Sequence, residues 1–294
     1  MISTTACGKI ILFGEHSVVY GKPAIAVPLK ELRLSVKIEK SNDFIITSDV
    51  FSHIEELKEG VNKITKKLNV PNKLKLTVSS DIPLSSGFGS SAAFSVAVTK
   101  AVAKHFGITL NLKQIKEISY ESENVFHGTA SGLDNTVIAY EKSVYFVKGK
   151  EPEILHIKNS FSFIIVNIGI KSDTSEVVNE LRERYDSNKE NISLIFDEIE
   201  SIVDKARTAL EEGNISFLGE LMDKNQKCLK RLGLSINEID SLVTKLKDLG
   251  ALGAKLSGAG KGGNVIALLP EEKVDEAKEK LREEGKEVFS VNIG

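Results

Sequence analysis

Residues 83–93 have the sequence Pro-Leu-Ser-Ser-Gly-Phe-Gly-Ser-Ser-Ala-Ala. Residues 74–79, just before them, alternate between apolar and polar side chains, which predicts a half-buried strand. The Ala-rich segment 92–103 predicts a buried helix. The Gly/Ser stretch thus precedes a helix N-terminus, whose N–H groups and positive dipole end attract anions. Because Gly87 and Gly89 let the backbone approach such an anion closely, we predict a triphosphate-binding loop.

An ordinary Gly/Ser loop that caps a helix is the alternative interpretation of this stretch taken alone. It is not a Walker A loop, because no Lys-Ser or Lys-Thr follows the glycines. It is not Gly-x-Gly-x-x-Gly either, because Ala92 stands in the place of the third glycine. The choice depends on the rest of the chain.

Composition restricts the classes of function. The 294 residues suffice for one large domain or two smaller ones, and 41% hydrophobic with 27% charged residues is typical of a globular protein. A net charge of -2 does not favour a nucleic-acid surface. Cys7 and Cys228 make neither a disulfide framework nor a metal cluster. We expect no membrane span and no signal peptide, and hence a cytoplasmic protein.

Residues 6–14 predict a short apolar strand that contains Lys9 and leads directly into Glu15 and His16. A lysine in a buried strand is costly unless it has a partner. An edge lysine that reaches solvent is the alternative. Because Glu15 and His16 follow immediately, we interpret Lys9 as functional.

Other periodic segments outline two domains. Strand patterns lie at 33–39, 44–47, 143–147 and 161–168, and we expect 44–47 to pair with 33–39. Helical patterns cover 53–69 and most of 174–249, and 254–293 predicts strand, turn, strand, helix and strand. We predict domains at 1–160 and 161–294.

A helix that begins after Asn111 carries a carboxylate on its apolar face. Asn111 and Gln114 predict a capping box. At ~100° per residue, Glu123 projects within about 20° of Leu112. A buried carboxylate needs a cation, a donor or a metal. A different register, with Glu123 in solvent, is the alternative.

Two more glycine-containing turns carry polar residues. Residues 127–133 lead to Asp134 and then to an apolar run, a position that suits a catalytic group, although Asp134 as a turn cap is the alternative. Residues 255–263 are Lys-Leu-Ser-Gly-Ala-Gly-Lys-Gly-Gly between two predicted strands. A simple hairpin turn with additional glycines is the alternative interpretation. Four glycines together with Ser257 and two lysines are, however, more than a hairpin turn requires.

Together, the motifs at 6–21, 83–93 and 255–263 resemble the GHMP kinase superfamily of small-molecule kinases, over nearly the whole chain. Within it, residues 9–21 and 128–135 are most similar to the mevalonate kinases; galactokinases usually continue Gly-Glu-His with Thr-Asp-Tyr, where this chain has Ser-Val-Val. The resemblance implies a two-domain α+β fold. Its N-terminal domain would resemble domain 2 of ribosomal protein S5, its C-terminal domain would be ferredoxin-like, and the active site would lie in the cleft.

The resemblance also implies ATP and Mg²⁺ as cofactors and mevalonate as the acceptor. Asp134 would be the general base near the 5-hydroxyl, with Lys9 in contact with both. Ser91 and Glu123 would hold Mg²⁺, whose preferred ligands are hard oxygens. The phosphate loop would comprise Pro83, Leu84, Ser85, Ser86, Gly87, Phe88, Gly89, Ser90, Ser91 and Ala92. The substrate side would comprise Glu15, His16, Ser131, Thr174, Gly258, Ala259 and Gly260.

The chain departs from the family pattern at two places. Lys261 stands in a motif that often reads Gly-Ala-Gly-Gly-Gly-Gly, where it either adds charge near the γ-phosphate or points outward. Ser85-Ser86 stand where Gly-Ala is frequent.

Two other functions compete with mevalonate phosphorylation. One is a kinase for phosphomevalonate, a sugar, homoserine or shikimate, and the other is a non-catalytic ATP sensor. A phosphorylated acceptor would need extra Arg or Lys, and the motifs supply only Lys9. The resemblance further implies a homodimer. The net charge and the lack of a long apolar run lead us to expect neither nucleic acid nor membrane as a partner.

Overall fold

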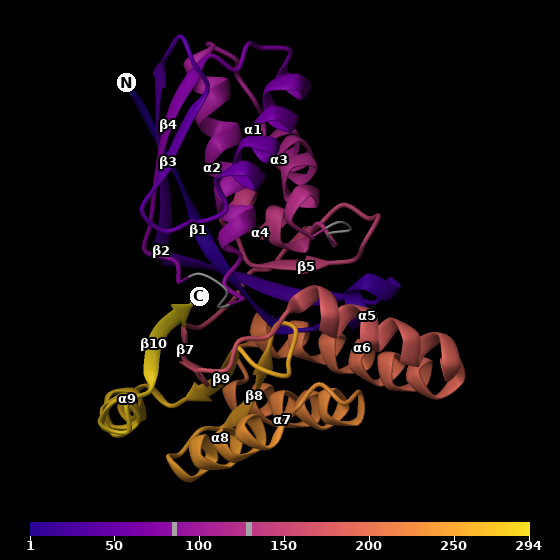
Figure 1. The fold of residues 1–294 in the computed structure, drawn as a ribbon. Coiled ribbons are helices and arrows are strands. Elements are labelled where there is room, and N and C mark those ends of the chain that lie inside the picture. The colour runs from indigo at the N-terminus through magenta and orange to yellow at the C-terminus, as the bar shows by residue number, and fades with distance from the viewer. Residues whose placement is uncertain (84–86, 128–130) are drawn as a thin grey trace. The chain divides into compact units, whose positions relative to one another are not determined.

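A computed structural model describes residues 1–83, 87–127 and 131–294. By their contacts these residues form two compact units, shown in Figure 1. The first contains the described residues of 1–10, 28–84 and 88–142, and the second contains 11–27, Gly87 and 143–294. The chain thus passes between the units more than once, and the predicted domains 1–160 and 161–294 stay a prediction.

The strands of the first unit follow the alternating sequence patterns. β1 (Ile2–Phe13) pairs with β2 (Ala24–Lys40), and the second half of β2 runs antiparallel to β4 (Leu74–Ser80). The apolar members of the β2 pattern, Leu34, Val36 and Ile38, have no exposed surface. One face of these strands is therefore the core face.

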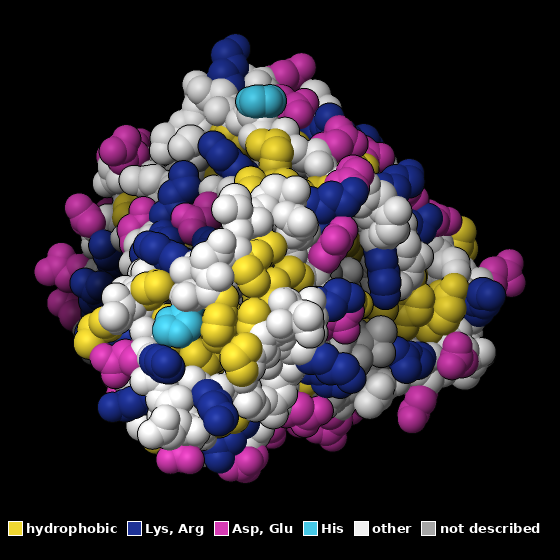
Figure 2. Space-filling view, turned by 90° about the horizontal axis from the view of Figure 1, so that it is seen from above, with side chains coloured by type: hydrophobic (Ala, Val, Ile, Leu, Met, Phe, Trp, Pro, Cys, Tyr) yellow, Lys and Arg dark blue, Asp and Glu magenta, His cyan; other side chains and the backbone are white. Residues whose placement is uncertain are grey.

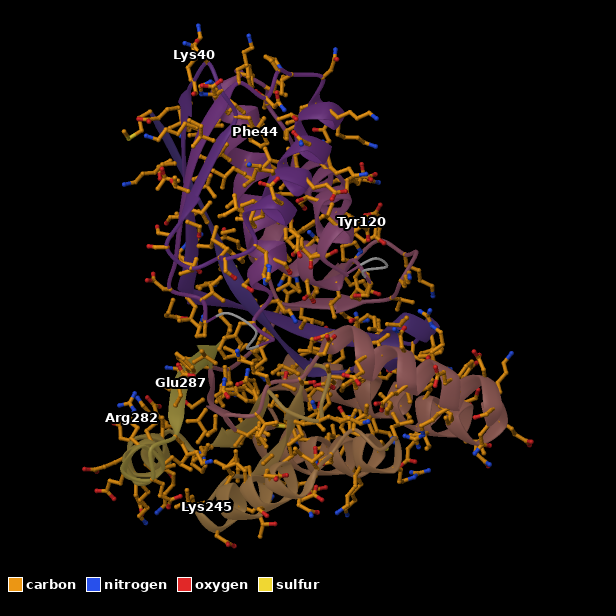
Figure 3. All side chains as sticks on the ribbon, in the orientation of Figure 1. Lys40, Phe44, Tyr120, Lys245, Arg282 and Glu287 are labelled. Atoms are coloured by element: carbon orange, nitrogen blue, oxygen red, sulfur yellow. The ribbon has the colours of Figure 1, made fainter. Side chains whose placement is uncertain are left out.

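The expected partner of segment 44–47 was wrong. β3 (Ile45–Ser48) pairs with β4, in parallel, and not with β2. Figure 3 labels Lys40 and Phe44 at the two ends of the short connection from β2 to β3. The parallel pairing follows from α1 (Ile54–Leu68), because the helix between β3 and β4 returns the chain to the same end of the sheet.

Helices cover these strands within the same unit (Figure 1). α2 (Ser90–His105) is mostly buried between Ala92 and Ala103 and packs against α1, α3 (Leu112–His127) and α4 (Leu133–Tyr140). The capping box before α3 is confirmed: the backbone N of each of Asn111 and Gln114 donates to the other's side-chain oxygen at 2.9 Å. The glycine stretch 83–93 thus connects a sheet strand to a core helix.

The second unit contains an antiparallel sheet in the order β10-β7-β9-β8. These strands are β7 (Phe161–Asn167), β8 (Gly253–Ser257), β9 (Asn264–Leu269) and β10 (Glu287–Ile293). The apolar run of β7 suits its inner position, where Ile164 and Ile165 are fully buried. α9 (Val274–Glu283) precedes β10, with Arg282 and Glu287 labelled in Figure 3.

Helices dominate the rest of this unit, as the sequence predicts. They are α5 (Thr174–Ser187), α6 (Lys189–Glu212), α7 (Ile215–Arg231), α8 (Asn237–Asp248) and the short η1 (Ser17–Tyr20) and η2 (Glu271–Lys273). β5 (Val144–Phe146) pairs with the start of β2 and with β6 (Glu153–Ile154). α7 packs against α6 and β8, and Tyr20 of η1 packs on Tyr185 and Phe196 with ring centroids 4.6 and 4.7 Å apart.

The surface carries both signs of charge. On the face in Figure 2, Lys and Arg side chains are interspersed with Asp and Glu. None of the helices in the described ranges has the length and apolar content to cross a membrane.

Candidate active site

An ion pair joins β1 to α4 in the first unit. Lys9 is 4% exposed, and its Nζ lies 3.0 Å from Oδ2 of Asp134. Asp134 is in the first turn of α4, and its side chain is 29% exposed. The buried lysine has the partner that its burial requires, and the carboxylate keeps one side open to a small molecule.

Gly89 provides the space through which the Lys9 side chain passes. A Cβ at Gly89 would lie 3.0 Å from Cγ and Cε of Lys9 and 3.3 Å from Ile138. The φ of Gly89 is also +74°, a conformation that favours glycine. The backbone N of Lys9 donates to the carbonyl of Phe88 at 2.9 Å. The motifs at 6–21 and 83–93 therefore contact each other at Lys9, Phe88 and Gly89.

The N-terminus of α2 lies beside this pair. Its N-cap is Gly89, and the bond from the Ala93 N–H to the Gly89 carbonyl, at 2.8 Å, closes its first turn. The N–H groups of a first turn and the helix dipole favour an anion at this end. Of the other predicted loop residues, Pro83 is half-buried and Gly87 is exposed with a φ of +75°. Leu84, Ser85 and Ser86 lie outside the described residues.

Glu123 faces the interior, as its helical projection predicts. It is 2% exposed, and the Ser91 hydroxyl donates to its Oε1 at 3.0 Å. Burial raises the pKa of the Glu123 carboxyl to about 8, and the nearby Asp134 raises it further, against the opposing effects of Ser91 and Lys9. A carboxyl held at such a pKa next to a second carboxylate is typical of a functional site.

The oxygens of Ser91 and Glu123 fit a hard divalent cation. No group of three His, Cys, Asp or Glu side chains in the described chain is placed to hold a metal ion. Mg²⁺ usually takes only one or two protein carboxylates and completes its coordination with water and phosphate oxygens. A hydroxyl and a carboxylate at the N-terminus of α2 match that requirement.

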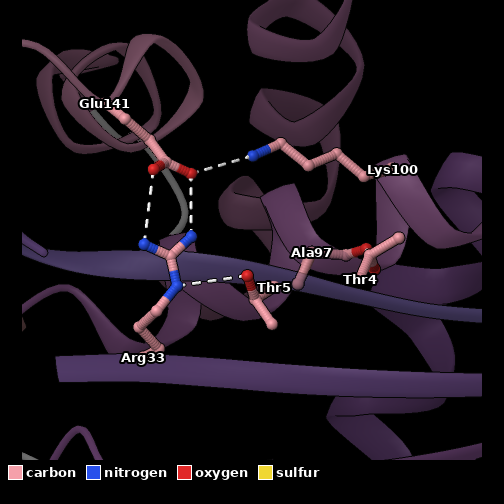
Figure 4. A network of polar contacts seen from close by, with 6 residues as sticks. All are labelled: Thr4, Thr5, Arg33, Ala97, Lys100 and Glu141. Carbon is pink, nitrogen blue, oxygen red and sulfur yellow. Dashed lines mark hydrogen bonds and ion pairs between the residues drawn. The ribbon is translucent and has the colours of Figure 1, made fainter. Parts of the chain in front are cut away.

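The other end of α4 is anchored by a second set of charges (Figure 4). Glu141, the C-cap of α4, accepts from both terminal nitrogens of Arg33 at 3.0 and 3.3 Å and from Lys100 at 3.3 Å. Arg33 also donates to Thr5 on β1 at 3.1 Å. Burial alone would raise the pKa of Glu141, but Arg33 and Lys100 hold it below its usual value. The helix that carries Asp134 is thereby tied to β1, β2 and α2.

In the second unit, the first and third motifs contact each other. Glu15 and Lys255 form an ion pair in which neither side chain is exposed. His16 Nε2 lies 2.7 Å from the carbonyl of Ala259, and because a carbonyl only accepts, Nε2 carries the proton. Burial lowers the pKa of His16, and burial also lowers the pKa of Lys255 against the attraction of Glu15.

The third glycine loop, residues 258–263, is held by hydrogen bonds to other residues of the second unit. The Ser172 hydroxyl donates to the Gly260 carbonyl at 2.6 Å, and the Lys261 N–H donates to the Leu234 carbonyl at 2.7 Å. The Lys261 side chain forms an ion pair with Glu180 on α5. In this structure its ammonium group is therefore directed to α5.

The remaining predicted residues lie at element boundaries. Thr174 is the exposed first residue of α5, whose N-cap Asp173 accepts from two backbone N–H groups. Ser131 accepts from the Leu133 N–H at 3.2 Å just before α4, and Gly258 follows β8 with a φ of +92°. Thr174 and Gly258 belong to the second unit and Ser131 to the first.

Sequence reasoning missed Lys255. Lys255 lies in a short strand whose five residues are all buried, at the start of the glycine-rich stretch 255–263. The rule that singled out Lys9, that a lysine in a buried strand needs a partner, applies equally to Lys255. That rule would have found it.

Two domain models of one protein family match this chain. The model of the GHMP kinases N terminal domain matches residues 55–142, and that of the GHMP kinases C terminal matches residues 206–287. The mevalonate kinase of Archaeoglobus fulgidus is 34% identical over 275 residues, which cover 92% of this chain and 93% of the relative. The mevalonate kinase of Thermococcus sibiricus is 31% identical over 310 residues, which cover 94% of this chain and 91% of the relative.

Solved structures agree with the sequence relatives. The crystal structure of L. major mevalonate kinase in complex with R-mevalonate is similar to this structure, with a TM-score of 0.89 and 26% sequence identity. The match covers 100% of this chain and 96% of the L. major chain. The two-domain α+β fold that the resemblance implies is confirmed, and it contains two sheets.

Glu123→Gln is expected to stabilise the ligand-free protein increasingly as the pH rises. The pKa of Glu123 is raised from 4.5 to about 8, so between these values the unfolded chain gives up its proton first and wild type loses stability. Gln has no proton to lose. Its advantage in unfolding free energy should therefore grow to about 4 kcal/mol by about pH 8. Urea unfolding of both proteins across this pH range measures it.

Glu121→Gln is the matched control, because Glu121 lies on the same helix with its side chain 46% exposed. An advantage of Glu123→Gln that stays constant with pH, or that Glu121→Gln shares, would contradict the raised pKa.

Lys261→Gly is expected to leave thermal stability unchanged or slightly higher. Lys261 has a φ of +54°, a conformation that costs a non-glycine residue roughly 1 kcal/mol. Its ion pair with Glu180 is only partly buried and contributes about 0.5 kcal/mol. Thermal unfolding compares this variant with Gly260→Ala in the same loop, whose Cβ would lie 2.5 Å from the Leu234 carbonyl. If Lys261→Gly destabilises as much as Gly260→Ala, the side chain of Lys261 matters more than the strain of its backbone.

Proposed function

The chain belongs to the GHMP kinase family, and from this premise we propose that it phosphorylates mevalonate. The proposed reaction transfers the γ-phosphoryl group of ATP to the 5-hydroxyl of mevalonate and yields 5-phosphomevalonate and ADP. The observation that carries the proposal is the Lys9–Asp134 ion pair at the N-terminus of α2. It provides a proton acceptor and a cation beside an anion site. The names of the curated relatives support mevalonate as the acceptor.

Asp134 is the proposed general base. Its carboxylate takes the proton of the 5-hydroxyl as that oxygen attacks the γ-phosphorus and the bond to the ADP oxygen breaks. Lys9, 3.0 Å from Asp134, stabilises the negative charge that develops on the attacking oxygen. The buried contacts of Lys9 against Gly89 fix its position before substrate arrives.

The phosphates of ATP are proposed to bind at the α2 N-terminus and the loop 83–92. Ser91 and Glu123 are proposed to hold Mg²⁺, which would neutralise charge on the β- and γ-phosphate oxygens. The Ser91–Glu123 hydrogen bond of 3.0 Å keeps these two oxygens together. Because the pKa of Glu123 is raised, a cation bound there would take the place of the carboxyl proton.

A set of residues that the family resemblance implies is proposed to bind the acceptor. The proposed set is Glu15, His16, Ser131, Thr174, Gly258, Ala259 and Gly260. We further propose a cytoplasmic homodimer that acts in isoprenoid biosynthesis. Light scattering of the purified protein tests the dimer.

ADP release from ATP and Mg²⁺ tests the acceptor, with mevalonate, phosphomevalonate, galactose and homoserine offered separately. Release with mevalonate alone is the expected result. Release with another acceptor would keep the phosphate site and refute the proposed acceptor. ATP binding without release for any acceptor would favour a nucleotide sensor.

Asp134→Asn is expected to bind ATP nearly as wild type does while its kcat falls by roughly 10² to 10⁴. The amide keeps the shape of the carboxylate but accepts no proton. Calorimetric ATP titration and steady-state kinetics separate the two effects. Asp43→Asn, in an exposed turn before β3, is the control for loss of one aspartate. Normal turnover by Asp134→Asn would remove Asp134 from the mechanism.

A further inference from the structure

The Glu15–Lys255 pair is enclosed more completely than the other ion pairs of the described residues. Both side chains have 0% exposure, although the two residues are 240 positions apart in the chain. The ammonium group of Lys255 also donates to the Leu256 carbonyl at 2.8 Å. Lys255 thus holds a specific carboxylate and a specific backbone carbonyl in one orientation.

Stability alone does not account for this pair. Removing two charges from water costs about as much free energy as their attraction returns, so uncharged residues of similar volume often serve a core equally well. What a buried pair adds is a fixed geometry, because each charge is poorly accommodated anywhere else. The contribution of the pair is therefore sought in the groups that it orients.

Two more contacts lie on either side of the pair. The Ser257 hydroxyl donates to the Ile11 carbonyl at 2.8 Å, and His16 Nε2 donates to the Ala259 carbonyl at 2.7 Å. The segment that carries Glu15 and His16 is thus tied to the end of β8 at three points. Gly258 lies between these ties with a φ of +92°, so they set the direction in which the third glycine loop leaves β8.

The side chain of Glu15 has no exposed surface, whereas the adjacent His16 is 8% exposed and adopts a φ of +61° that is unusual for a non-glycine residue. A local strain of this kind persists only where the surroundings enforce it. The enclosed pair lies next to the strained residue and provides such an enforcement.

We propose that Lys255 is a positioning residue: through its ion pair with Glu15 it fixes His16 and the start of the third glycine loop for the acceptor. The proposal rests on the proposed function, since the acceptor side of the kinase site is what it organises. For Glu15 this replaces the role proposed above: its side chain has no exposed surface, so it acts through the geometry of its neighbours and not by direct contact with the acceptor.

A double-mutant cycle of Lys255→Met and Glu15→Gln tests the proposal. Each single variant is expected to raise the KM for mevalonate about tenfold or more and to leave the KM for ATP within about twofold. The two effects should not multiply, because both variants break the same pair. The double variant, which buries no unpaired charge, should unfold near the wild-type temperature and still show the raised mevalonate KM. It keeps the test valid if Lys255→Met alone does not fold.

Lys247→Met is the matched control, because Lys247 also binds one carboxylate, Asp223, and one backbone carbonyl, that of Leu252. It should leave the mevalonate KM unchanged. A folded double variant with a wild-type mevalonate KM would overturn the proposal. Single effects that multiply, or an equal rise in the KM for ATP, would overturn it as well.

Imidazole NMR signals of His16, assigned with His16→Gln, provide a readout that needs no turnover. They should shift in the double variant and not in Lys247→Met. If wild type does not use mevalonate, the proposed function fails, while the His16 signals still decide whether Lys255 positions this segment. Unchanged His16 signals in the double variant would overturn the positioning role whatever the acceptor.

Discussion

The cost of burying the ammonium group of Lys9 is the constraint on which the first unit depends. Lys9 lies within β1 and has almost no contact with solvent, so the fold must supply a countercharge at a fixed place. Asp134 supplies it from α4, and Gly89 leaves the space through which the lysine reaches it. One electrostatic requirement thereby fixes the relation between a strand, the N-terminus of α2 and the N-terminus of α4. The three elements carry the groups that a phosphoryl-transfer site needs. β1 carries a cation, α2 provides an anion-binding helix end, and α4 carries a proton acceptor.

The second unit solves the same problem in a different way. Lys255 also lies in a strand, but its pair with Glu15 is closed to solvent, whereas Asp134 keeps nearly a third of its side chain exposed. An open pair leaves the carboxylate able to exchange a proton with a substrate. A closed pair has no such access and serves geometry. The Lys261–Glu180 pair on the same loop is partly exposed and exerts a weaker constraint than either. Exposure, more than the identity of the charges, separates these three roles.

Local patterns in the sequence predicted most elements, because each signal was itself local. Strand alternation, the amphipathic α1, the capping box of α3 and the interior direction of Glu123 all depend on residues a few positions apart. The pairing of β3 with β4 was missed because parallel pairing is decided by the helix between the strands and not by the strands themselves. The Glu15–Lys255 contact was missed because it joins residues 240 positions apart, and no periodicity reports such a distance. The predicted members Leu84, Ser85 and Ser86 lie outside the described residues, so their part of the phosphate loop remains a prediction.

The length of α4 explains why Asp134 needs support from both ends of its helix. α4 spans only Leu133–Tyr140, and a helix of eight residues has too few internal hydrogen bonds to hold itself rigid in water. Lys9 binds its first turn, while Arg33 and Lys100 bind Glu141 directly after its last residue. Because Arg33 also contacts Thr5 on the strand that carries Lys9, the two anchors share β1. A displacement of α4 along its axis would have to stretch one anchor or the other. The position of the proposed base therefore follows from a closed set of charge contacts within one unit, and it does not depend on the intrinsic stability of the short helix.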